Sequence, residues 1–221
     1  MRHFDLELKD LREGIMAMAA AVEEMIELTM QAVSERSEAK AERVHQLDRQ
    51  LDEWELKLDQ LCIDLLALRA PAARDLRLIA SSLKIVPELE RIGDHCCNIA
   101  RRATSVHPPI LRPGLLEQMA LETRGMVRLA VDAFIGSDQG LARAVIQSDD
   151  SVDALYGQIY RDLLRLMMSD PLCVERASHL ILIIKNWERI ADQATNIAEE
   201  VLFILEGRNA KHPYLKADGV D

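Results

Sequence analysis

The sequence predicts an all-α protein: two tandem three-helix bundles, six long helices in all, related by an internal duplication. Apolar residues recur at helical spacing through six segments. Aromatic residues make up only 4% of the chain, whereas Leu, Ala, Met, Glu and Arg are abundant, a composition that favours helix over sheet. A fifteen-residue motif also occurs once in each half of the chain. Together these observations indicate a repeated helical unit.

The first half of the chain contains three helical segments. Apolar residues at steps of four and three predict a helix from about residue 4 to 35. A second apolar seam, between Leu47 and Leu65, precedes the sequence RAPAARD, in which Pro71 fits the first turn of the next helix. The third segment continues through Pro87, where we expect a kink rather than an end.

The second half follows a proline-rich stretch and again contains three helical segments. The stretch TSVHPPILRPG, at residues 104–114, contains three prolines and a glycine, and we expect no helix in it. Helices are then expected from about residue 115 to 135, around a seam from Val152 to Leu166, and from near Leu172 to Gly207. The predicted boundaries are a first repeat at 1–105, a linker at 106–114, a second repeat at 115–206 and a loose C-terminal tail at 207–221.

The duplication is visible in the third helix of each half. ELERIGDHCCNIARR, at residues 88–102, and NWERIADQATNIAEE, at residues 186–200, share seven identical positions of fifteen. About one identity is expected by chance at ordinary residue frequencies. The two halves are therefore predicted to be copies of one unit.

Charge and composition exclude several classes of function. The net charge of −10 argues against nucleic-acid binding, which depends on neutralising phosphates. The longest apolar run, LILII at residues 180–184, is too short to span a bilayer, and the first residues do not resemble a signal peptide. The four cysteines show no Cys-x-x-Cys spacing, so we expect reduced thiols packed as small apolar side chains. These features predict a cytoplasmic protein.

Pairs of acidic residues recur in both halves, one helical turn apart. The third helix of each half carries an E-x-x-x-D pair that continues its apolar stripe, and the second helix carries a D-x-x-x-D pair. Helices two and three are joined by a short turn and must be antiparallel neighbours, so four carboxylates are expected to converge in each half. The candidate residues are Asp48, Asp52, Glu90 and Asp94 in the first half, and Asp149, Asp153, Glu188 and Asp192 in the second.

Carboxylates beside an apolar core are costly unless they are paired or bound to metal. Sets of oxygen ligands suit hard cations such as Mg, Ca, Mn or Fe. The repeated pattern favours a metal site in each half, and a purely structural charge network is the alternative interpretation.

No catalytic constellation is evident in the sequence. It contains no nucleophile–base pair, no glycine-rich phosphate loop, and a single Glu-x-x-His string, Glu42 to His45, without a counterpart in the second half. We therefore expect a protein that is not an enzyme; a metal-dependent enzyme or a metal-storage helical bundle is the alternative.

Two long motifs resemble the paired signatures of the PhoU family of phosphate-specific transport system accessory proteins. They are PAARDLRLIASSLKIVPELERIGDHCCNIARR in the first half and LILIIKNWERIADQATNIAEEV in the second. The resemblance covers essentially the whole chain and implies paired three-helix bundles, usually as a homodimer. It also implies multinuclear clusters of divalent or trivalent metal ions, with Fe, Mn, Mg or Zn as candidates, on the eight carboxylates named above. One departure from the pattern is Ala191, which stands where the first motif has Gly93.

The same resemblance implies a regulatory role in phosphate homeostasis. Members of the family repress phosphate-starvation signalling, apparently by linking the ATPase subunit of a phosphate ABC transporter to a PhoR-type sensor histidine kinase. The expected protein is thus a non-catalytic negative regulator of phosphate uptake that approaches the membrane only through its partners.

Overall fold

The computed structural model describes residues 3–111 and 114–207, and this part of the chain contains six long α-helices, two short 3-10 helices and no strand. The all-α prediction with six long helices is therefore confirmed. In chain order the elements are α1 (His3–Glu35), α2 (Glu38–Arg69), α3 (Ala73–Ala100), η1 (Ala103–Val106), α4 (Leu115–Gly136), α5 (Gln139–Ser169), η2 (Pro171–Cys173) and α6 (Val174–Glu206).

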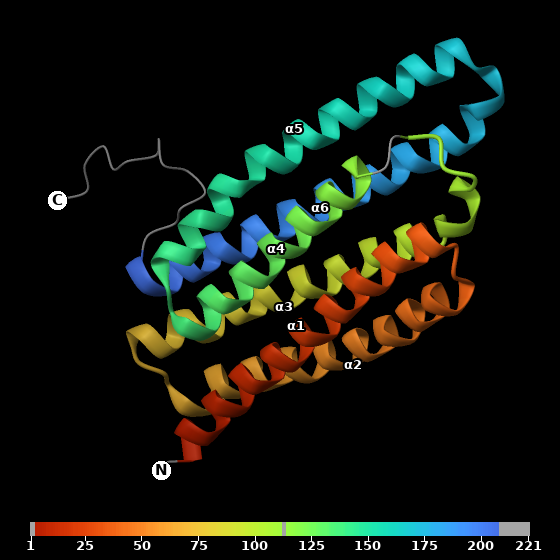
Figure 1. Ribbon diagram of the computed structural model, residues 1–221. Coiled ribbons are helices and arrows are strands. Elements are labelled where there is room, and N and C mark those ends of the chain that lie inside the picture. The colour runs from red at the N-terminus through yellow and green to blue at the C-terminus, as the bar shows by residue number, and fades with distance from the viewer. Residues whose placement is uncertain (1–2, 112–113, 208–221) are drawn as a thin grey trace.

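The six helices form two layers. One layer has the order α2, α3, α6, α5, with the third helix of each repeat at its centre (Figure 1). In the other layer, α1 covers α2 and α3, α4 covers α5 and α6, and α1 also contacts α4. Each repeat is thus a three-helix bundle, and the two bundles pack through α3 against α6.

Side-chain caps fix the tight turns inside each repeat. Ser37 begins α2 by accepting a hydrogen bond from the Lys40 backbone N–H at 3.3 Å. Asp138 begins α5 by accepting from the N–H groups of Gly140 and Leu141, at 2.7 and 3.0 Å. Such caps satisfy backbone donors that the first helical turn leaves free, so the chain reverses within a few residues.

The element boundaries differ from the sequence prediction at three places. Pro71 lies before α3 rather than in its first turn, because the helix starts only at Ala73. The start of the proline-rich stretch is not fully irregular, since the single 3-10 turn η1 reaches Val106. The last helix begins at Val174 and not near Leu172, because Asp170 caps the separate 3-10 turn η2.

Two other expectations concern Pro87 and the tail. Helix α3 runs through Pro87 without ending there, as expected. The predicted loose tail lies outside the described residues apart from Gly207, whose left-handed backbone conformation ends α6.

One apolar core extends through both repeats. Its largest fully buried side chain is Trp187 of α6, and the same cluster contains residues of α1, α2, α3, α4 and α5. All four cysteines are reduced and buried, as predicted for small apolar side chains. Within the described residues, no helix combines the length and apolarity needed to cross a bilayer. The two repeats therefore share one hydrophobic core instead of folding around two separate cores.

Polar contacts fasten the two repeats at both ends of the α3–α6 contact. At one end, Arg77 of α3 donates to the carbonyl oxygen of Ile204 near the end of α6, at 3.1 Å. At the other end, Arg176 of α6 donates to the carbonyl oxygen of Pro108, beyond the end of α3, at 2.9 Å. Each bond joins an arginine side chain of one repeat to a backbone carbonyl of the other, so both ends of the α3–α6 contact are tied across the repeats.

Candidate functional site

In the first repeat, the four predicted carboxylates of α2 and α3 differ in how deeply they are buried. Asp48 and Glu90 are half-buried, whereas Asp52 and Asp94 are exposed. The spacing suggested that both acids of α3 continue its buried stripe, but Asp94 does not. They sit at its solvent edge, where the first acid of each pair is covered and the second is not.

Glu90 is an acid of the first repeat whose pKa is raised by both burial and neighbouring charges. Burial raises the pKa of Glu90 to about 7, and the negative charges of neighbouring acids contribute to the shift; these are Asp94, Glu55, Asp52 and Asp48. Burial also raises the pKa of Asp48, with Asp94 and Asp52 acting in the same direction. The first repeat thus brings its four predicted carboxylates into one electrostatic neighbourhood.

A close approach of α2 to α3 positions Asp48. Gly93 has no side chain, and a Cβ at this position would overlap Cδ1 of Leu51 and lie 3.3 Å from Oδ1 of Asp48. Leu51 is fully buried. The glycine of the first motif therefore allows α2 to pack directly over the turn between Glu90 and Asp94.

The second repeat resembles the first, but three of its four acids, Asp149, Glu188 and Asp192, are half-buried and only Asp153 is exposed. Burial raises the pKa of Asp149 to about 6, and the charges of Asp153 and Asp192 add to the effect. Burial and the Asp192 charge likewise raise the pKa of Glu188. Here, however, Arg189 lies among the acids, with Nη1 at 3.3 Å from Oδ2 of Asp192 and Nε at 3.6 Å from Oε2 of Glu188.

The equivalent arginine of the first repeat is directed elsewhere. Arg91 pairs with Glu88, with Nη1 3.1 Å from Oε1, rather than with Glu90 or Asp94. The second cluster therefore has an internal cation beside it, and the first cluster has less compensation for its negative charge.

Glu55 belongs to the first cluster, although the sequence analysis did not single it out. It lies one turn beyond Asp52 on α2, its pKa is raised by burial and by the charges of Asp59 and Asp52, and it contributes to the shift at Glu90. The duplication hid this residue, because Tyr156 occupies the matching position in the second repeat and stacks on Tyr160, with ring centroids 6.0 Å apart. The sequence signal that could have identified Glu55 as a member of the cluster was its position three residues after Asp52.

The donor atoms present suit a hard cation, because each cluster offers only carboxylate oxygens, and two of the four acids in the first repeat and three of the four in the second are partly shielded from water. As the side chains lie in the described residues, no three His, Cys, Asp or Glu groups are arranged to hold a metal ion. A bound cation would therefore require the exposed members of each cluster to turn toward the half-buried ones. The chemistry of the residues fits a metal, and their assignment as ligands stays a prediction.

This architecture, two fused three-helix bundles with duplicated acidic pairs on the second and third helices, defines a class of tandem-repeat helical proteins. The family model described as "PhoU domain" matches residues 15–103 and 116–201. The chain belongs to the PhoU family, and the resemblance seen in the two motifs is thereby confirmed.

Relatives and solved structures agree with this assignment. Proteins named phosphate-specific transport system accessory protein PhoU homolog are 38% identical in Pseudomonas putida, covering 97% of this chain and 85% of that protein, and 38% identical in Aquifex aeolicus, covering 96% and 97%. The crystal structure of PhoU from Pseudomonas aeruginosa superposes with a TM-score of 0.88 at 36% identity, covering 93% of this chain and 100% of that one. The phosphate transport system regulatory protein PhoU from Streptococcus pneumoniae also gives 0.88, at 26% identity, covering 94% and 99%. The family is non-enzymatic, which agrees with the expectation that the chain is not an enzyme.

Proposed function

We propose that this chain is a non-catalytic accessory protein of a phosphate transport system that represses phosphate-starvation signalling. It would act in the cytoplasm as an adaptor between the ATPase subunit of a phosphate ABC transporter and a PhoR-type sensor histidine kinase. The observation that carries the proposal is the family match in both repeats, together with relatives of the same name that align over nearly the whole chain.

The physical properties of the chain suit an adaptor. Its described helices form one fused body with a continuous core, so a force or contact at one repeat is transmitted to the other. Its net charge of −10 disfavours nucleic acid and anionic lipid as direct partners. We therefore propose that the direct partners are proteins at the membrane. The proposal also includes association of the chain as a homodimer.

Deletion of the gene tests the regulatory role. We expect a reporter of phosphate-starvation genes to become active in cells grown at high phosphate, and the wild-type gene supplied in trans to restore repression. A reporter that stays repressed in the deletion strain would refute the proposal. Pull-down of the tagged protein at high and low phosphate, probed for the transporter ATPase and for the histidine kinase, tests the two partners separately.

The metal sites form a separate part of the proposal. We propose that the four carboxylates of each repeat bind divalent or trivalent cations, with Fe, Mn, Mg or Zn as candidates, because cations would offset the burial and the mutual repulsion that together raise the pKa of Glu90 and Asp149. Bound metal would brace α2 against α3 and α5 against α6.

Elemental analysis of the purified protein tests the metal sites. We expect stoichiometric metal, and we expect the double substitution Glu90→Gln with Asp94→Asn to remove the share held by the first repeat only. The control is Glu53→Gln, at an exposed residue of α2 that pairs with Lys57 on the helix surface. Metal-free protein, or equal loss in the control, would leave the acids as a structural charge network. Turnover or mineralisation that Glu90→Ala abolishes in a folded protein would favour the metal enzyme or storage alternative.

A further inference from the structure

The arginine of the E-x-x-x-D motif has a different partner in each repeat. Arg91 and Arg189 hold the same motif position, directly after the first acid. Nη1 of Arg91 lies 3.1 Å from Oε1 of Glu88, which is outside the acid pair. Arg189 instead pairs with both acids of its own motif, Glu188 at 3.6 Å and Asp192 at 3.3 Å. The duplicated arginine is thus directed away from one acid pair and into the other.

Glu88 draws Arg91 toward the contact between the repeats. The side chain of Glu88 is only 13% exposed, and its Oε2 accepts a hydrogen bond from Nδ2 of Asn196 on α6, at 3.2 Å. The first cluster lies on the other flank of α3, where Glu90 faces the acids of α2. Glu88 therefore holds Arg91 on the side of α3 that faces α6.

Asn186 stands at the position of Glu88 in the second repeat, and it cannot hold an arginine in the same way. Its Oδ1 accepts a hydrogen bond from Nδ1 of His95 on α3 at 3.0 Å, and its Nδ2 donates to the carbonyl oxygen of Leu182 at 2.6 Å. A neutral amide that is already bonded offers no negative charge to a guanidinium. Arg189 therefore turns to the acids that face α5.

The charges around the half-buried glutamates show the same difference. The neighbouring charges that contribute most to the raised pKa of Glu90 are all negative, and they act in the same direction as burial. Burial also raises the pKa of Glu188, but there the positive charge of Arg189 opposes the rise. Oε2 of Glu188 is buried and accepts no hydrogen bond from the described residues, so the ion pair with Arg189 compensates its charge. Arg91 opposes the rise at Glu55 of α2, where its effect ranks below burial and two neighbouring acids.

We propose that the two clusters bind divalent cations with unequal affinity, and that the first repeat holds the tighter site because Arg189 already supplies a positive charge to the second. Glu88 and Asn186 decide this difference, since they direct the arginine that follows away from the acids or toward them. The inference rests on the metal sites proposed above and is independent of the regulatory role.

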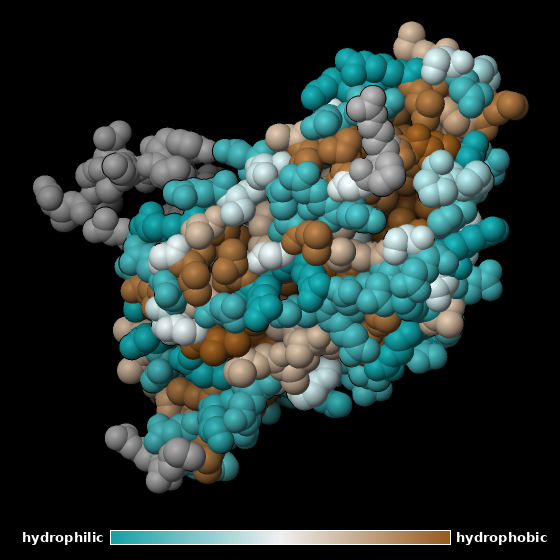
Figure 2. Space-filling view, viewed as in Figure 1, coloured by the Kyte–Doolittle hydropathy of each residue, from teal (hydrophilic) through white to brown (hydrophobic). Residues whose placement is uncertain are grey.

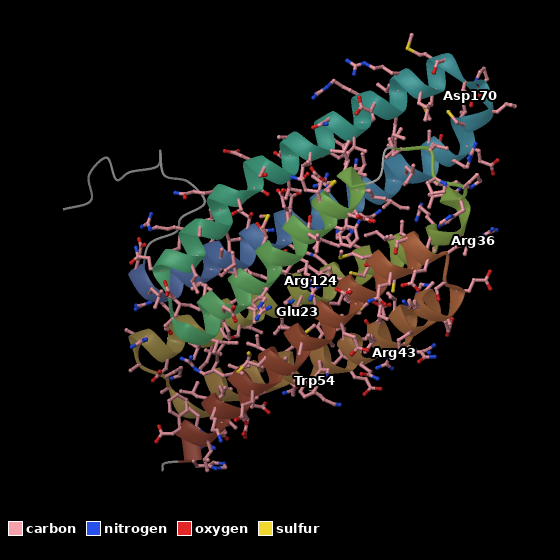
Figure 3. All side chains as sticks on the ribbon, in the orientation of Figure 1. Glu23, Arg36, Arg43, Trp54, Arg124 and Asp170 are labelled. Atoms are coloured by element: carbon pink, nitrogen blue, oxygen red, sulfur yellow. The ribbon has the colours of Figure 1, made fainter. Side chains whose placement is uncertain are left out.

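The two clusters can be tested separately, because they lie on different pairs of helices. One lies between α2 and α3, and the other between α5 and α6. Figure 3 labels Trp54 on α2 and Asp170 at the turn between α5 and α6, and these two residues mark the two helix pairs. Substitutions in one pair therefore leave the ligands of the other in place.

Titration with Mn²⁺ alone, with free Mn²⁺ measured by electron paramagnetic resonance, compares the two sites. The variant Asp153→Asn with Asp192→Asn keeps the first cluster, and Glu90→Gln with Asp94→Asn keeps the second. We expect the first cluster to bind Mn²⁺ at least about tenfold more tightly than the second. Hydrophilic residues cover much of the face shown in Figure 2, and the chain carries a net charge of −10, so a variant with all four substitutions is needed to measure weak binding to the acidic surface.

Removal of each arginine tests the cause of the difference. In the variant that keeps the second cluster, Arg189→Gln should tighten Mn²⁺ binding by about tenfold, because it removes the competing charge. In the variant that keeps the first cluster, Arg91→Gln should change the affinity by less than about twofold. The matched control is Arg165→Gln, which removes the same charge from another pair at i,i+3 spacing, with Asp162 at 3.1 Å, and should leave the affinity of the second cluster unchanged.

Glu88→Gln tests whether Glu88 directs the arginine. Once Glu88 is neutral, Arg91 should turn toward the first cluster and weaken Mn²⁺ binding there. Arg91→Gln should then tighten binding by about fivefold in the Glu88→Gln background, although it has little effect when Glu88 is present. Circular dichroism of each variant checks that the helices are retained.

The outcomes separate this inference from the metal proposal. Equal affinities of the two clusters, a tighter second cluster, or an Arg189→Gln variant that binds as Arg165→Gln does would overturn the inference and leave the metal sites standing. Equal effects of Arg91→Gln with and without Glu88 would remove the directing role of Glu88. Mn²⁺ binding no greater than that of the fourfold variant, in either cluster, would refute the metal sites and the inference together.

Discussion

Glu90 and Asp149 illustrate how the position of a carboxyl group in the fold changes its chemistry. Both are half-buried, and both have a raised pKa, to about 7 and about 6 respectively, caused first by burial and then by neighbouring acids. At neutral pH the repulsion in the first repeat is relieved either by a proton on Glu90 or by a cation. Proton binding and metal binding at this residue are therefore competing events.

Glu90 should make the stability of the metal-free protein depend on pH. Because its folded-state pKa lies above the unfolded value, the native state holds more protons, and the free energy of unfolding falls as pH rises from about 4.5 to about 7. Glu90→Gln removes this contribution. In buffers containing a chelator, the melting temperature of Glu90→Gln relative to wild type should therefore increase between pH 5 and pH 8.

The control for this measurement is Glu53→Gln, whose exposed side chain pairs with Lys57 on the surface of α2. Its melting temperature should run parallel to that of the wild type over the same pH range. A constant difference between Glu90→Gln and wild type would mean that Glu90 is fully ionised throughout.

At the scale of single elements, the contact between α2 and α3 depends on Gly93. The second repeat has Ala191 at the matching position, and this alanine is buried in the core. The sequence comparison showed only that the two motifs differ at this position. The structure adds a packing role, since Leu51 occupies the space where a side chain of residue 93 would lie.

Gly93→Ala should destabilise the protein in spite of the higher helix propensity of alanine. The gain from propensity is about 0.5 to 1 kcal/mol, whereas overpacking against a fully buried leucine costs about 1 to 3 kcal/mol. We expect a net loss of about 1 kcal/mol in urea unfolding.

Leu51→Val in the Gly93→Ala background should recover part of that loss, because it shortens the side chain that clashes. A double-mutant cycle would therefore show favourable coupling between the two substitutions. Additive effects would indicate that Leu51 rotates away from the new methyl group at no cost.

At the scale of the whole molecule, one buried charge stands between the repeats. Glu200 of α6 is only 6% exposed, and its carboxylate accepts hydrogen bonds from Ser81 Oγ at 3.1 Å and from Lys84 Nζ at 3.0 Å, both on α3. Glu200 is the buried partner, whereas Lys84 is largely exposed, so the bonds contribute little net stability but penalise arrangements that leave the buried carboxylate without them. These bonds of Glu200, together with the hydrogen bond from Arg77 of α3 to the carbonyl oxygen of Ile204 near the end of α6, fix the relative orientation of the two bundles.

Glu200→Ala should cost about 2 kcal/mol of unfolding free energy, since it removes charge-assisted hydrogen bonds from a buried site. The matched control is Glu206→Ala on the same helix, where the exposed pair with Arg143, at 2.8 Å, should contribute less than about 1 kcal/mol. Both values can be measured by urea unfolding. Equal effects of the two substitutions would show that the buried pair does not hold the repeats together.

Much of the fold was predictable because helical periodicity is a local property. The six apolar seams, the proline-rich break and the repeated motif predicted the number and order of the helices without reference to their packing. The ends of elements were less predictable. The sequence placed Pro71 inside the first turn of α3, although this helix starts only at Ala73, and it placed the start of α6 near Leu172 rather than at Val174. Capping by residues such as Asp170 decides where an element begins.

The sequence by itself determined that this protein is helical and duplicated, and that each copy carries acidic pairs on its second and third helices. Spacing along a helix is enough for this, because it specifies which residues share a face. Only the tertiary structure decided how deeply each acid lies, which residues such as Glu55 and Arg189 join the clusters, and how the two bundles fuse through α3 and α6. These properties depend on the distance and angle between neighbouring helices, which arise from packing contacts between residues far apart in the chain.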